Sequence, residues 1–441
     1  MRPLPLTLLA TLMAPLVTTL MAFMPAAQAA ATTAAAPPTT VLHVGHLLAD
    51  PAQPVRERQS VVIQGGKITA IKAGYVAGDT VVDLKQAWVL PGLIDMHTHV
   101  TVEMDVHSKN PTADFMPAYL DRPVPRAFAS AARAQALQQQ GFTTLRNLGD
   151  PANITYDLAG AIAAGLVKGP RLIGSEPQFE TAGGDYAAFN LSVRADVEPL
   201  FTNRGTCSGP TDCERAVRDE IRRGAGVIKL RLSATHLLVP GSGPTETRAE
   251  LEAIVATAHR LNRKVATHSS GLSSANLLAI EAGTDTLEHG PLSEADIAAM
   301  VRHGTAFTPT LLASKVAGES GALGAPTDLL AAATESARKA HAAGIPLLFG
   351  SDVPVPPLDG TAQEFLLLAA AGLTPAEVLA TATTNAAKAL GMETQLGTVA
   401  AGKFADVVAF AANPLSDLKV LASPVFVMQN GKVVRNDTVQ H

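Results

Sequence analysis

The sequence predicts an α/β protein whose central part is a closed (β/α)8 barrel of parallel strands. Eight short apolar runs alternate with Ala-rich segments over about 300 residues, which is the order of elements that such a barrel requires. Two of these segments have the Thr-x-x-Glu spacing of a helical capping box, at Thr211 with Glu214 and at Thr247 with Glu250. An open doubly wound sheet is the alternative, and it is disfavoured because no Gly-rich phosphate loop follows any run.

The amino-terminal residues predict export. Arg2 precedes a long apolar stretch that ends in Ala27-Gln28-Ala29, the small-x-small pattern of a signal-peptidase site. We therefore expect residues 1–29 to be a signal peptide and the mature protein to be periplasmic or secreted, with no membrane association after cleavage. An uncleaved membrane anchor is the alternative, because the stretch is long enough, although prolines within it disfavour this.

The two ends of the mature chain predict one small sheet domain. After an Ala/Thr/Pro linker at 30–40, residues 41–90 consist of short alternating or β-branched runs separated by Gly-containing turns. Residues 393–441 repeat this pattern, and Asn430-Gly431 between two apolar runs is a strong hairpin signal. We expect both segments to join in one composite β domain.

The barrel is expected to occupy residues 91–392. Its eight strands are predicted from apolar runs, several of which end on a polar residue with metal-binding or acid–base chemistry. In chain order, the runs are VLPGLIDMH, FTTLRNLG, PRLIGSEP, GVIKLRLS, KVATHSS, TDTLEHG, TAFTPTL and IPLLFGSDV.

The charge balance limits the possible partners. The formal net charge is -5, and charged residues make up 17% of the chain, so there is no basic excess to bind nucleic acid. A small, weakly charged substrate fits this composition better.

Cys207 and Cys213 are the two cysteines of the chain and lie in the turn-rich stretch TCSGPTDCE. An oxidising compartment favours a disulfide across this short loop. Two free thiols are the alternative. Zinc binding by this pair alone is disfavoured, because no histidine or further cysteine lies nearby in the sequence.

Polar residues at strand ends predict a metal site. His97 and His99 lie two residues apart on an extended strand, so both side chains point to the same side. Active sites of parallel barrels lie at the carboxyl ends of the strands, and paired imidazoles there suit a divalent cation. Four later runs also end on polar residues: Lys229, His268, His289 and Asp352. Together these residues predict one site.

These motifs resemble those of the amidohydrolase superfamily. The resemblance is carried by DMHTH, the lysine of the fourth run, the two later histidines and GSD in the eighth run, and it covers the chain after the export signal. It implies a distorted (β/α)8 TIM barrel with a small β-sandwich domain formed by both termini, and two divalent metal ions, expected to be Zn²⁺. By this resemblance His97, His99 and Asp352 would hold one cation, and His268 and His289 would hold the other. Lys229 would bridge the two cations.

The resemblance also implies the chemistry. Lys229 would be N6-carboxylated, because a buried amine that loses its proton can add carbon dioxide and then bridge two cations as a carbamate. A hydroxide between the cations would attack the scissile carbonyl, and Asp352 would move its proton to the leaving nitrogen. The expected catalytic residues are therefore Asp352, Lys229 and His289.

Longer segments narrow the expected substrate. GFTTLRNLGD, TLEHG and LGTVAAGKFADVVAF are similar to the imidazolonepropionase-like group, which includes Xaa-Pro and Xaa-Arg dipeptidases and ochratoxin-hydrolysing amidohydrolases. The resemblance implies a homo-oligomer that releases a C-terminal amino acid from a dipeptide or N-acyl amino acid, with ochratoxin A as one candidate. The chain departs from its relatives at Asp185 and Ser270, where many of them have histidine, and both positions bear on the substrate contacts and not on the implied metal ligands.

Three residues are candidates for contact with the substrate. Arg231 follows the fourth strand and could pair with a carboxylate, although an arginine there is as often a structural ion-pair partner. His236 lies in the loop after that strand, and His107 in the loop after the first. Loops at this end of a barrel set specificity.

Other functions remain open or are disfavoured. The same metals could hydrolyse a cyclic amide, a lactone or another carbon–nitrogen bond, and an exported binding protein could retain the barrel without turnover. A serine hydrolase is disfavoured because the sequence has no Gly-x-Ser-x-Gly motif, and a cysteine hydrolase because both cysteines lie in a loop.

Overall fold

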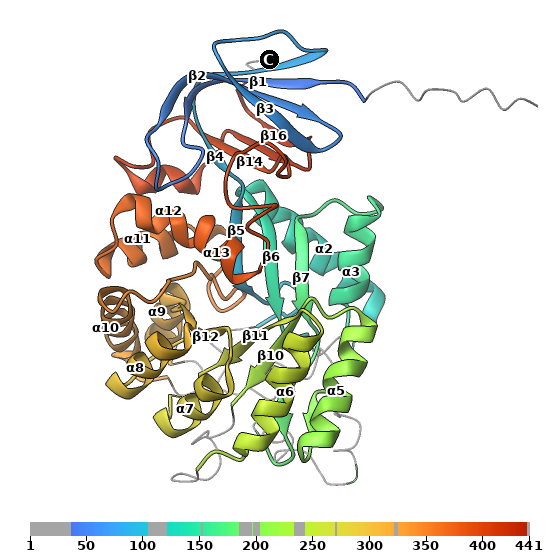
Figure 1. Ribbon diagram of the computed structural model, residues 1–441, viewed down its shortest axis with the longest axis vertical. Helices are drawn as coiled ribbons and strands as arrows, with labels where there is room; N and C mark the ends of the chain where they lie inside the picture. Colours follow the sequence, from blue (N-terminus) through green and yellow to red (C-terminus); the bar gives the residue numbers. More distant parts are fainter. Residues whose placement is uncertain are drawn as a thin grey trace, which may run out of the picture. The chain divides into compact units, whose positions relative to one another are not determined.

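Strands and helices alternate along most of the chain, as expected for an α/β protein (Figure 1). The computed structural model describes residues 37–104, 121–150, 153–184, 196, 203–232, 243–269, 271–321 and 325–438. The described residues from Pro38 onward form one unit. The predicted signal peptide at 1–29 and most of the linker at 30–40 lie outside the described residues.

Strands from both ends of the chain share one seven-stranded sheet, in the order β16-β15-β14-β4-β1-β2-β3. Antiparallel pairing of β14 with β4 joins the C-terminal strands to the N-terminal ones. The hairpin predicted at Asn430-Gly431 is confirmed, because both residues have positive φ between the antiparallel strands β15 and β16. A second layer facing this sheet, as in a sandwich, stays a prediction. The strands are β1 Thr40–Leu47, β2 Arg56–Gln64, β3 Lys67–Ala73, β4 Thr80–Pro91, β14 Val407–Phe410, β15 Phe426–Gln429 and β16 Lys432–Asn436.

Two sheets of parallel strands follow, in the orders β5-β6-β7 and β13-β12-β11-β10-β8-β9. Seven of the eight predicted runs contain one of these strands, whereas the sequence did not predict β8 and β9. The strands are β5 Leu93–Thr98, β6 Phe142–Leu148, β7 Arg171–Ser175, β8 Gln178–Thr181, β9 Thr206–Cys207, β10 Val227–Arg231, β11 Lys264–His268, β12 Thr286–Glu288 and β13 Ala306–Thr308.

The eighth predicted run, residues 345–353, does not form a continuous strand. It makes single parallel bridges instead, from Leu347 to β13 and from Val353 to β5. Pro346 has no amide hydrogen to donate, and the φ of 58° at Asp352 lies outside the β region. The run therefore contacts both parallel sheets without a regular ladder, and closure of the barrel stays a prediction.

Helices connect the parallel strands. The capping box predicted at Thr247 is confirmed, because Thr247 and Glu250 bond to each other's backbone amides. The one predicted at Thr211 is wrong: α5 begins at Pro210 with Gly209 as its N-cap, and proline is favoured at a first helical position. None of the described helices combines the length and apolar character needed to cross a membrane. The helices are α2 Pro123–Gln139, α3 Thr155–Ala163, α5 Pro210–Arg223, α6 Arg248–Arg260, α7 Ser273–Ala282, α8 Glu294–His303, α9 Leu311–Ser320, α10 Leu329–Ala342, α11 Gln363–Ala370, α12 Pro375–Thr381 and α13 Thr384–Ala389, with 3-10 turns at Leu358–Gly360 and Leu418–Ala422.

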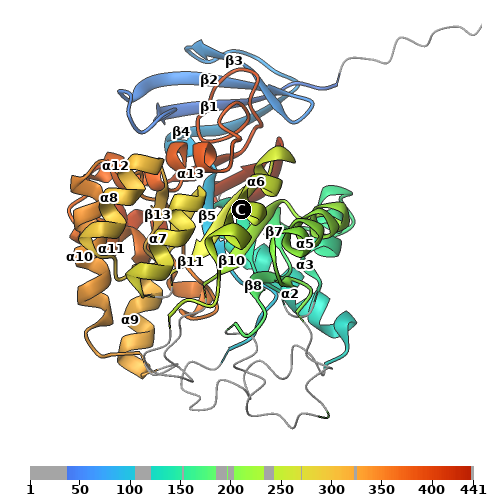
Figure 2. The same cartoon turned by 60° about the horizontal axis from the view of Figure 1, so that its bottom comes forward.

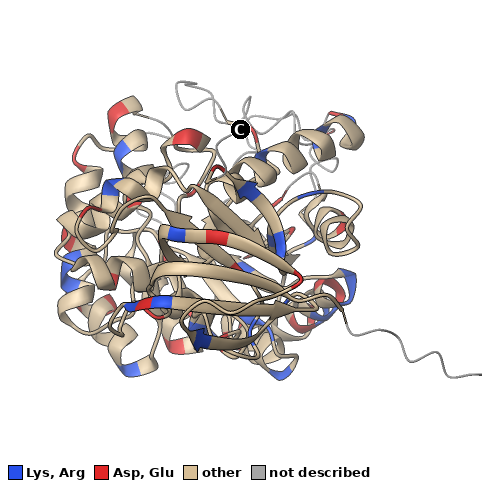
Figure 3. Ribbon diagram, turned by 90° about the horizontal axis from the view of Figure 1, so that it is seen from above, with Lys and Arg blue, Asp and Glu red and all other residues tan. Residues whose placement is uncertain are grey.

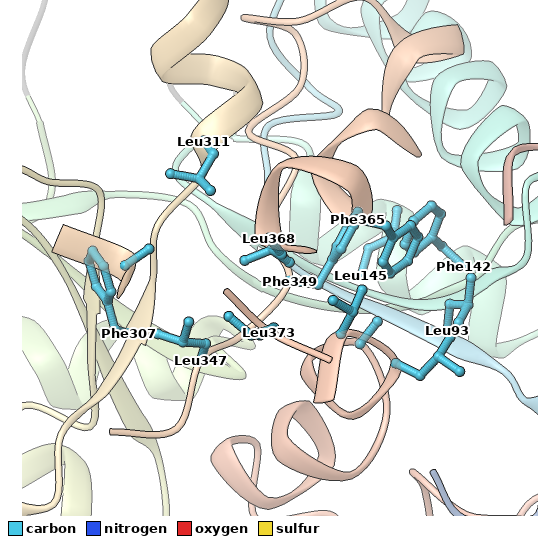
Figure 4. Packing of buried hydrophobic residues seen from close by; sticks show 14 of the residues in the cluster. Leu93, Phe142, Leu145, Phe307, Leu311, Leu347, Phe349, Phe365, Leu368 and Leu373 are labelled. Atoms are coloured by element: carbon cyan, nitrogen blue, oxygen red, sulfur yellow. The ribbon is translucent and has the colours of Figure 1, made fainter. Parts of the chain in front are cut away.

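An aromatic cluster holds residues 345–353 in place (Figure 4). The ring centroid of Phe349 lies 4.3 Å from that of Phe365 on α11 and 5.1 Å from that of Phe142 on β6. Contacts at these separations stabilise aromatic pairs beyond the burial of their surface. The segment that carries Asp352 is therefore fixed by packing, although it lacks a strand ladder.

The seven-stranded sheet lies at the amino ends of β5 and β6 (Figures 1 and 2). The Gly92 amide donates to the Asp406 carbonyl, and the Leu93 amide to the Gly141 carbonyl. Gly141 has φ +98°, and a Cβ atom there would lie 2.9 Å from a methyl group of Val408, so this contact requires glycine. The carboxyl ends of the strands consequently point away from this sheet.

Acidic and basic residues are interspersed over the strands and helices seen from the side of this sheet (Figure 3). A mixture of both signs gives no extended basic face on this side for a polyanion. The arrangement agrees with the small negative net charge of the chain.

Cys207 and Cys213 form a disulfide that links β9 to the first turn of α5. The bond closes a loop with a sequence separation of six residues, and removing it should cost about 2 kcal/mol by the loop-entropy relation. We expect a Cys207→Ser/Cys213→Ser variant to unfold at lower temperature and lower urea concentration than the oxidised wild type. Reductant should bring the wild type down to the same values, and a wild type indifferent to reductant would contradict the expectation.

Candidate metal centre

His97, His99 and Asp352 converge at the carboxyl end of β5. The Nε2 atoms of His97 and His99 each lie 3.4 Å from Oδ1 of Asp352. One ligand atom from each residue lies within 4.8 Å of the other two, so the three side chains form a group that could hold a metal ion. The extended backbone of β5 places the two imidazoles on one side, as predicted.

The backbone around this group is held by Asp95 and Gly350. Oδ1 of Asp95 accepts hydrogen bonds from the amides of His97 and Ser351, at 3.0 and 3.1 Å, and so ties β5 to the segment before Asp352. Burial raises the pKa of Asp95 to about 7. Gly350 lies so close to β5 that an added Cβ would be 2.9 Å from the Cβ of His97. Glycine at this position therefore allows Asp352 to approach the imidazoles.

His289 and His268 extend the cluster. The His289 ring centroid lies 4.6 Å from that of His97 and 4.6 Å from that of His268. His289 directly follows β12 and His268 ends β11, so both come from carboxyl ends of neighbouring parallel strands. Nδ1 of His289 lies 2.7 Å from the Thr310 hydroxyl oxygen and 3.8 Å from Oδ2 of Asp352.

Lys229 is buried in β10, two residues before the end of the strand. Its Nζ has no hydrogen-bond partner within the described part of the chain. Burial lowers the pKa of Lys229 to about 7, against the opposing charges of Glu288 and Asp352. A buried amine without a hydrogen-bond partner is costly as an ammonium ion, so this environment favours the neutral amine.

Two of the four clustered imidazoles, those of His97 and His99, are held in one arrangement. Nδ1 of His97 faces the Glu288 carboxylate at 2.8 Å, and Nδ1 of His99 faces the Gly149 carbonyl at 3.4 Å. Because these oxygens only accept hydrogen bonds, each Nδ1 carries the proton and each Nε2 has a free lone pair. Nδ1 of His289 contacts the Thr310 hydroxyl, which can donate or accept, so this contact does not by itself fix the tautomer.

Burial also favours the neutral forms of His97, His268 and His289. It lowers the pKa values of His97 and His268 well below the ordinary value and that of His289 to about 4. Burial favours the protonated form of Asp352, but the surrounding imidazoles outweigh it and lower the pKa of that carboxyl group. Neutral imidazoles beside a carboxylate are the donor set that a divalent cation requires.

A buried nitrogen without a partner is a second reason why these side chains fit a bound cation. Nε2 of His97 is buried and has no hydrogen-bond partner among the described residues, and it points at the same oxygen of Asp352 as Nε2 of His99. An orphaned buried nitrogen is costly unless a ligand satisfies it. A cation among His97, His99 and Asp352 would supply that partner.

The three predicted substrate contacts have different outcomes. Arg231 ends β10 opposite His268, and its Nη1 lies 3.4 Å from Oε1 of Gln178. Arg231 thus borders the cluster. His236 and His107 lie outside the described residues, as do Asp185 and Ser270.

The sequence did not predict the side chains that hydrogen-bond to the clustered histidines or hold those partners in place. Glu288 and Arg146 form a buried ion pair at 2.6 Å, and Thr310 contacts His289. A signal was present for two of them, because Arg146 interrupts an apolar run and Glu288 directly precedes a predicted ligand. Their partners are distant in the sequence, so spacing alone could not pair them.

Histidines and a carboxylate gathered at the carboxyl ends of parallel strands define the class of protein: an α/β protein with a candidate metal centre of the kind used by metal-dependent hydrolases. Comparison with known proteins makes this more specific. The chain belongs to the Amidohydrolase family, whose model matches residues 88–434. It is therefore a hydrolase that acts on carbon–nitrogen bonds, and the resemblance predicted from the sequence is confirmed.

Individual relatives cover nearly the whole chain. Ochratoxinase from Aspergillus niger is 27% identical over 428 residues, which span 90% of this chain and 86% of that protein. The structure of a Xaa-Pro dipeptidase with bound methionine in its active site matches with a TM-score of 0.78 and 29% identity, over 90% of this chain and 99% of that one. A prolidase complexed with N-methylphosphonate-L-proline gives 0.77 and 28%, over 90% and 100%.

Proposed function

We propose that this protein is a binuclear metal-dependent amidohydrolase that releases a C-terminal amino acid from a dipeptide or an N-acyl amino acid. The observation that carries the proposal is the convergence of His97, His99 and Asp352 beside a buried lysine without a hydrogen-bond partner among the described residues. The relatives named above supply the substrate class, since they include an ochratoxinase, a dipeptidase and a prolidase.

The proposed ligands fall into two groups joined by Lys229. His97, His99 and Asp352 would hold the first cation, and His268 with His289 the second. In the buried environment of Lys229, the neutral amine adds carbon dioxide: the new N–C bond forms as the nitrogen loses a proton, and the product is a carbamate anion. That anion would lie between the two groups of imidazoles. Divalent cations, for which we propose Zn²⁺, would supply an acidified water and an electrophile for the carbonyl oxygen.

Asp352 is the proposed proton carrier. Its Oδ1 faces the Nε2 atoms of His97 and His99, which leaves Oδ2 as the oxygen that exchanges a proton. Oδ2 would accept the proton of the attacking water and pass it to the amide nitrogen as the C–N bond breaks, so the products are a carboxylic acid and a free amine. His289 lies 3.8 Å from Oδ2 and would help to orient it.

Arg231 is the proposed anchor for the carboxylate of the released amino acid. It lies at the carboxyl end of β10, opposite His268 and within reach of Gln178. A guanidinium pairs with a carboxylate in a bidentate manner, which would orient the substrate as well as bind it.

The proposal extends to the cellular setting. We propose that the chain is exported and acts as a homo-oligomer on small amide substrates, without nucleic acid. The disulfide between Cys207 and Cys213 supports export, because such bonds persist in oxidising compartments.

A substrate screen tests the proposed function. Purified protein loaded with Zn²⁺ should release free amino acid from some members of a panel of N-acyl amino acids and dipeptides that includes ochratoxin A. Dialysis against a chelator should abolish release, and adding the metal back should restore it. Turnover confined to lactones or cyclic amides would replace the proposed substrate class, and lack of turnover on every compound would favour a binding protein.

A further inference from the structure

Glu288 is the side chain that connects the predicted metal ligands to the interior of the protein. It is the last residue of β12 and is completely buried. One oxygen, Oε2, accepts a hydrogen bond from Nδ1 of His97 at 2.8 Å. The other, Oε1, accepts from Nη2 of Arg146 at 2.6 Å and from the Thr286 hydroxyl at 2.5 Å. Both carboxylate oxygens therefore accept hydrogen bonds: Oε2 from a residue of β5, and Oε1 from residues of β6 and β12.

Arg146 holds this carboxylate from the opposite side. The guanidinium lies on β6, is 1% exposed, and donates from Nε to the Met96 carbonyl and from Nη1 to the Thr286 hydroxyl. A buried carboxylate needs a compensating cation and full hydrogen bonding to remain charged, and Arg146 supplies the charge. Glu288 therefore remains an acceptor, and Nδ1 of His97 must be the protonated nitrogen.

We infer that the Arg146–Glu288 pair is a positioning device that fixes the tautomer and ring orientation of His97 and thereby sets the affinity of the first cation. With Nδ1 protonated, the lone pair of His97 is on Nε2, the atom that lies 3.4 Å from Oδ1 of Asp352. The inference rests on the proposed function in that His97 is taken to be a metal ligand.

The same carboxylate links the two halves of the centre. Glu288 directly precedes His289, so the residue that orients His97 from β5 adjoins a predicted ligand of the second cation. A displacement of Glu288 would change the orientation of His97 and the backbone position of His289 together. Outer partners of this kind typically change metal affinity by about 10- to 100-fold when mutated.

A matched pair of variants tests the inference. Glu288→Gln removes the negative charge at His97. Glu220→Gln makes the same change in another glutamate, 1% exposed, whose Oε1 accepts from Arg204 at 2.9 Å and whose contacts within the described residues include no predicted metal ligand. We expect Glu288→Gln to weaken Zn²⁺ binding by about 10- to 100-fold in chelator competition, and Glu220→Gln to leave it within about twofold of the wild type.

A second readout does not depend on metal or turnover. In ¹⁵N-histidine spectra of the metal-free protein, assigned with a His97→Gln variant, His97 should carry its proton on Nδ1. Glu288→Gln should shift that equilibrium, because an amide both donates and accepts. Arg146→Lys keeps the charge but loses the forked contacts, and it replaces Glu288→Gln if that variant does not fold; a smaller weakening in the same direction is expected.

The outcomes separate the inference from the proposed function. Wild-type affinity in Glu288→Gln, equal weakening in both glutamate variants, or a wild-type His97 protonated on Nε2 would each overturn the positioning role. If the tautomer and the affinity respond as expected but no amide is cleaved, the positioning role stands and the proposed function fails. A wild type that binds no cation would overturn both.

Discussion

Asparagine in place of Asp352 is expected to lower kcat/KM for amide hydrolysis by about 10²- to 10⁴-fold, the range typical of removing a positioned acid–base group. The carboxamide cannot accept a proton from water at neutral pH, and it is a weaker ligand for a cation than a carboxylate. The backbone should be unchanged, because asparagine tolerates the φ of 58° found at this position. The rate of amino-acid release at saturating substrate gives kcat, and the rate at limiting substrate gives kcat/KM.

Asp285→Asn is the control for this variant. Asp285 also pairs with a histidine, at 2.7 Å from Nε2 of His259, but that histidine is not one of the predicted ligands. Its replacement should leave kcat/KM within about twofold of the wild type, since its described partners, the His259 ring, the Lys264 ammonium and the Val265 amide, include no predicted ligand. Full activity in Asp352→Asn would contradict the assignment of Asp352 as proton carrier.

Methionine in place of Lys229 should reduce activity by roughly 10³-fold, because losing the proposed bridge would remove several kcal/mol of transition-state stabilisation and 1.4 kcal/mol is tenfold in rate. The free energy of unfolding of the Lys229→Met variant should not fall along with its activity. Methionine is unbranched and apolar, so it fills the buried space without the cost of an amine that lacks a hydrogen-bond partner among the described residues. Activity and thermal unfolding are measured on the same samples.

The proposed carbamate on Lys229 can be detected directly by its mass. Native mass spectra of the wild type in bicarbonate should show an added mass of one carbon dioxide that Lys229→Met lacks. Because the neutral amine reacts and the pKa of Lys229 is about 7, the adduct should increase as the pH rises through 7. Lys264→Met, in a partly exposed lysine paired with Asp285, is the control and should retain the adduct. An adduct in Lys229→Met would contradict the assignment.

The sequence predicted the strands that end on chemically distinctive residues, and it failed where the backbone is irregular. Runs such as KVATHSS have a short buried middle and a polar end, so both the strand and its carboxyl end could be located. β8 and β9 are four and two residues long, too short for a periodic pattern to emerge. The eighth run was predicted as a strand from composition, but the positive φ at Asp352 depends on contacts that composition does not contain.

The candidate site shows the same limit. Positions at strand ends were enough to predict that His97, His99 and Asp352 would meet, because parallel strands bring their carboxyl ends together. The side chains that orient them come from residues far away in the sequence, such as Arg146 for Glu288. Such pairs follow from strand order and register, which a single sequence does not specify.

The pairing of β4 with β14 has a consequence for the making of the protein. A chain synthesised from its amino end has β4 ready more than 300 residues before β14, since β4 ends at Pro91 and β14 begins at Val407. Until then one edge of β4 has open backbone groups, which are prone to mispairing with other chains. The nascent polypeptide therefore has to be kept from aggregating until β14 has been synthesised and can pair with β4.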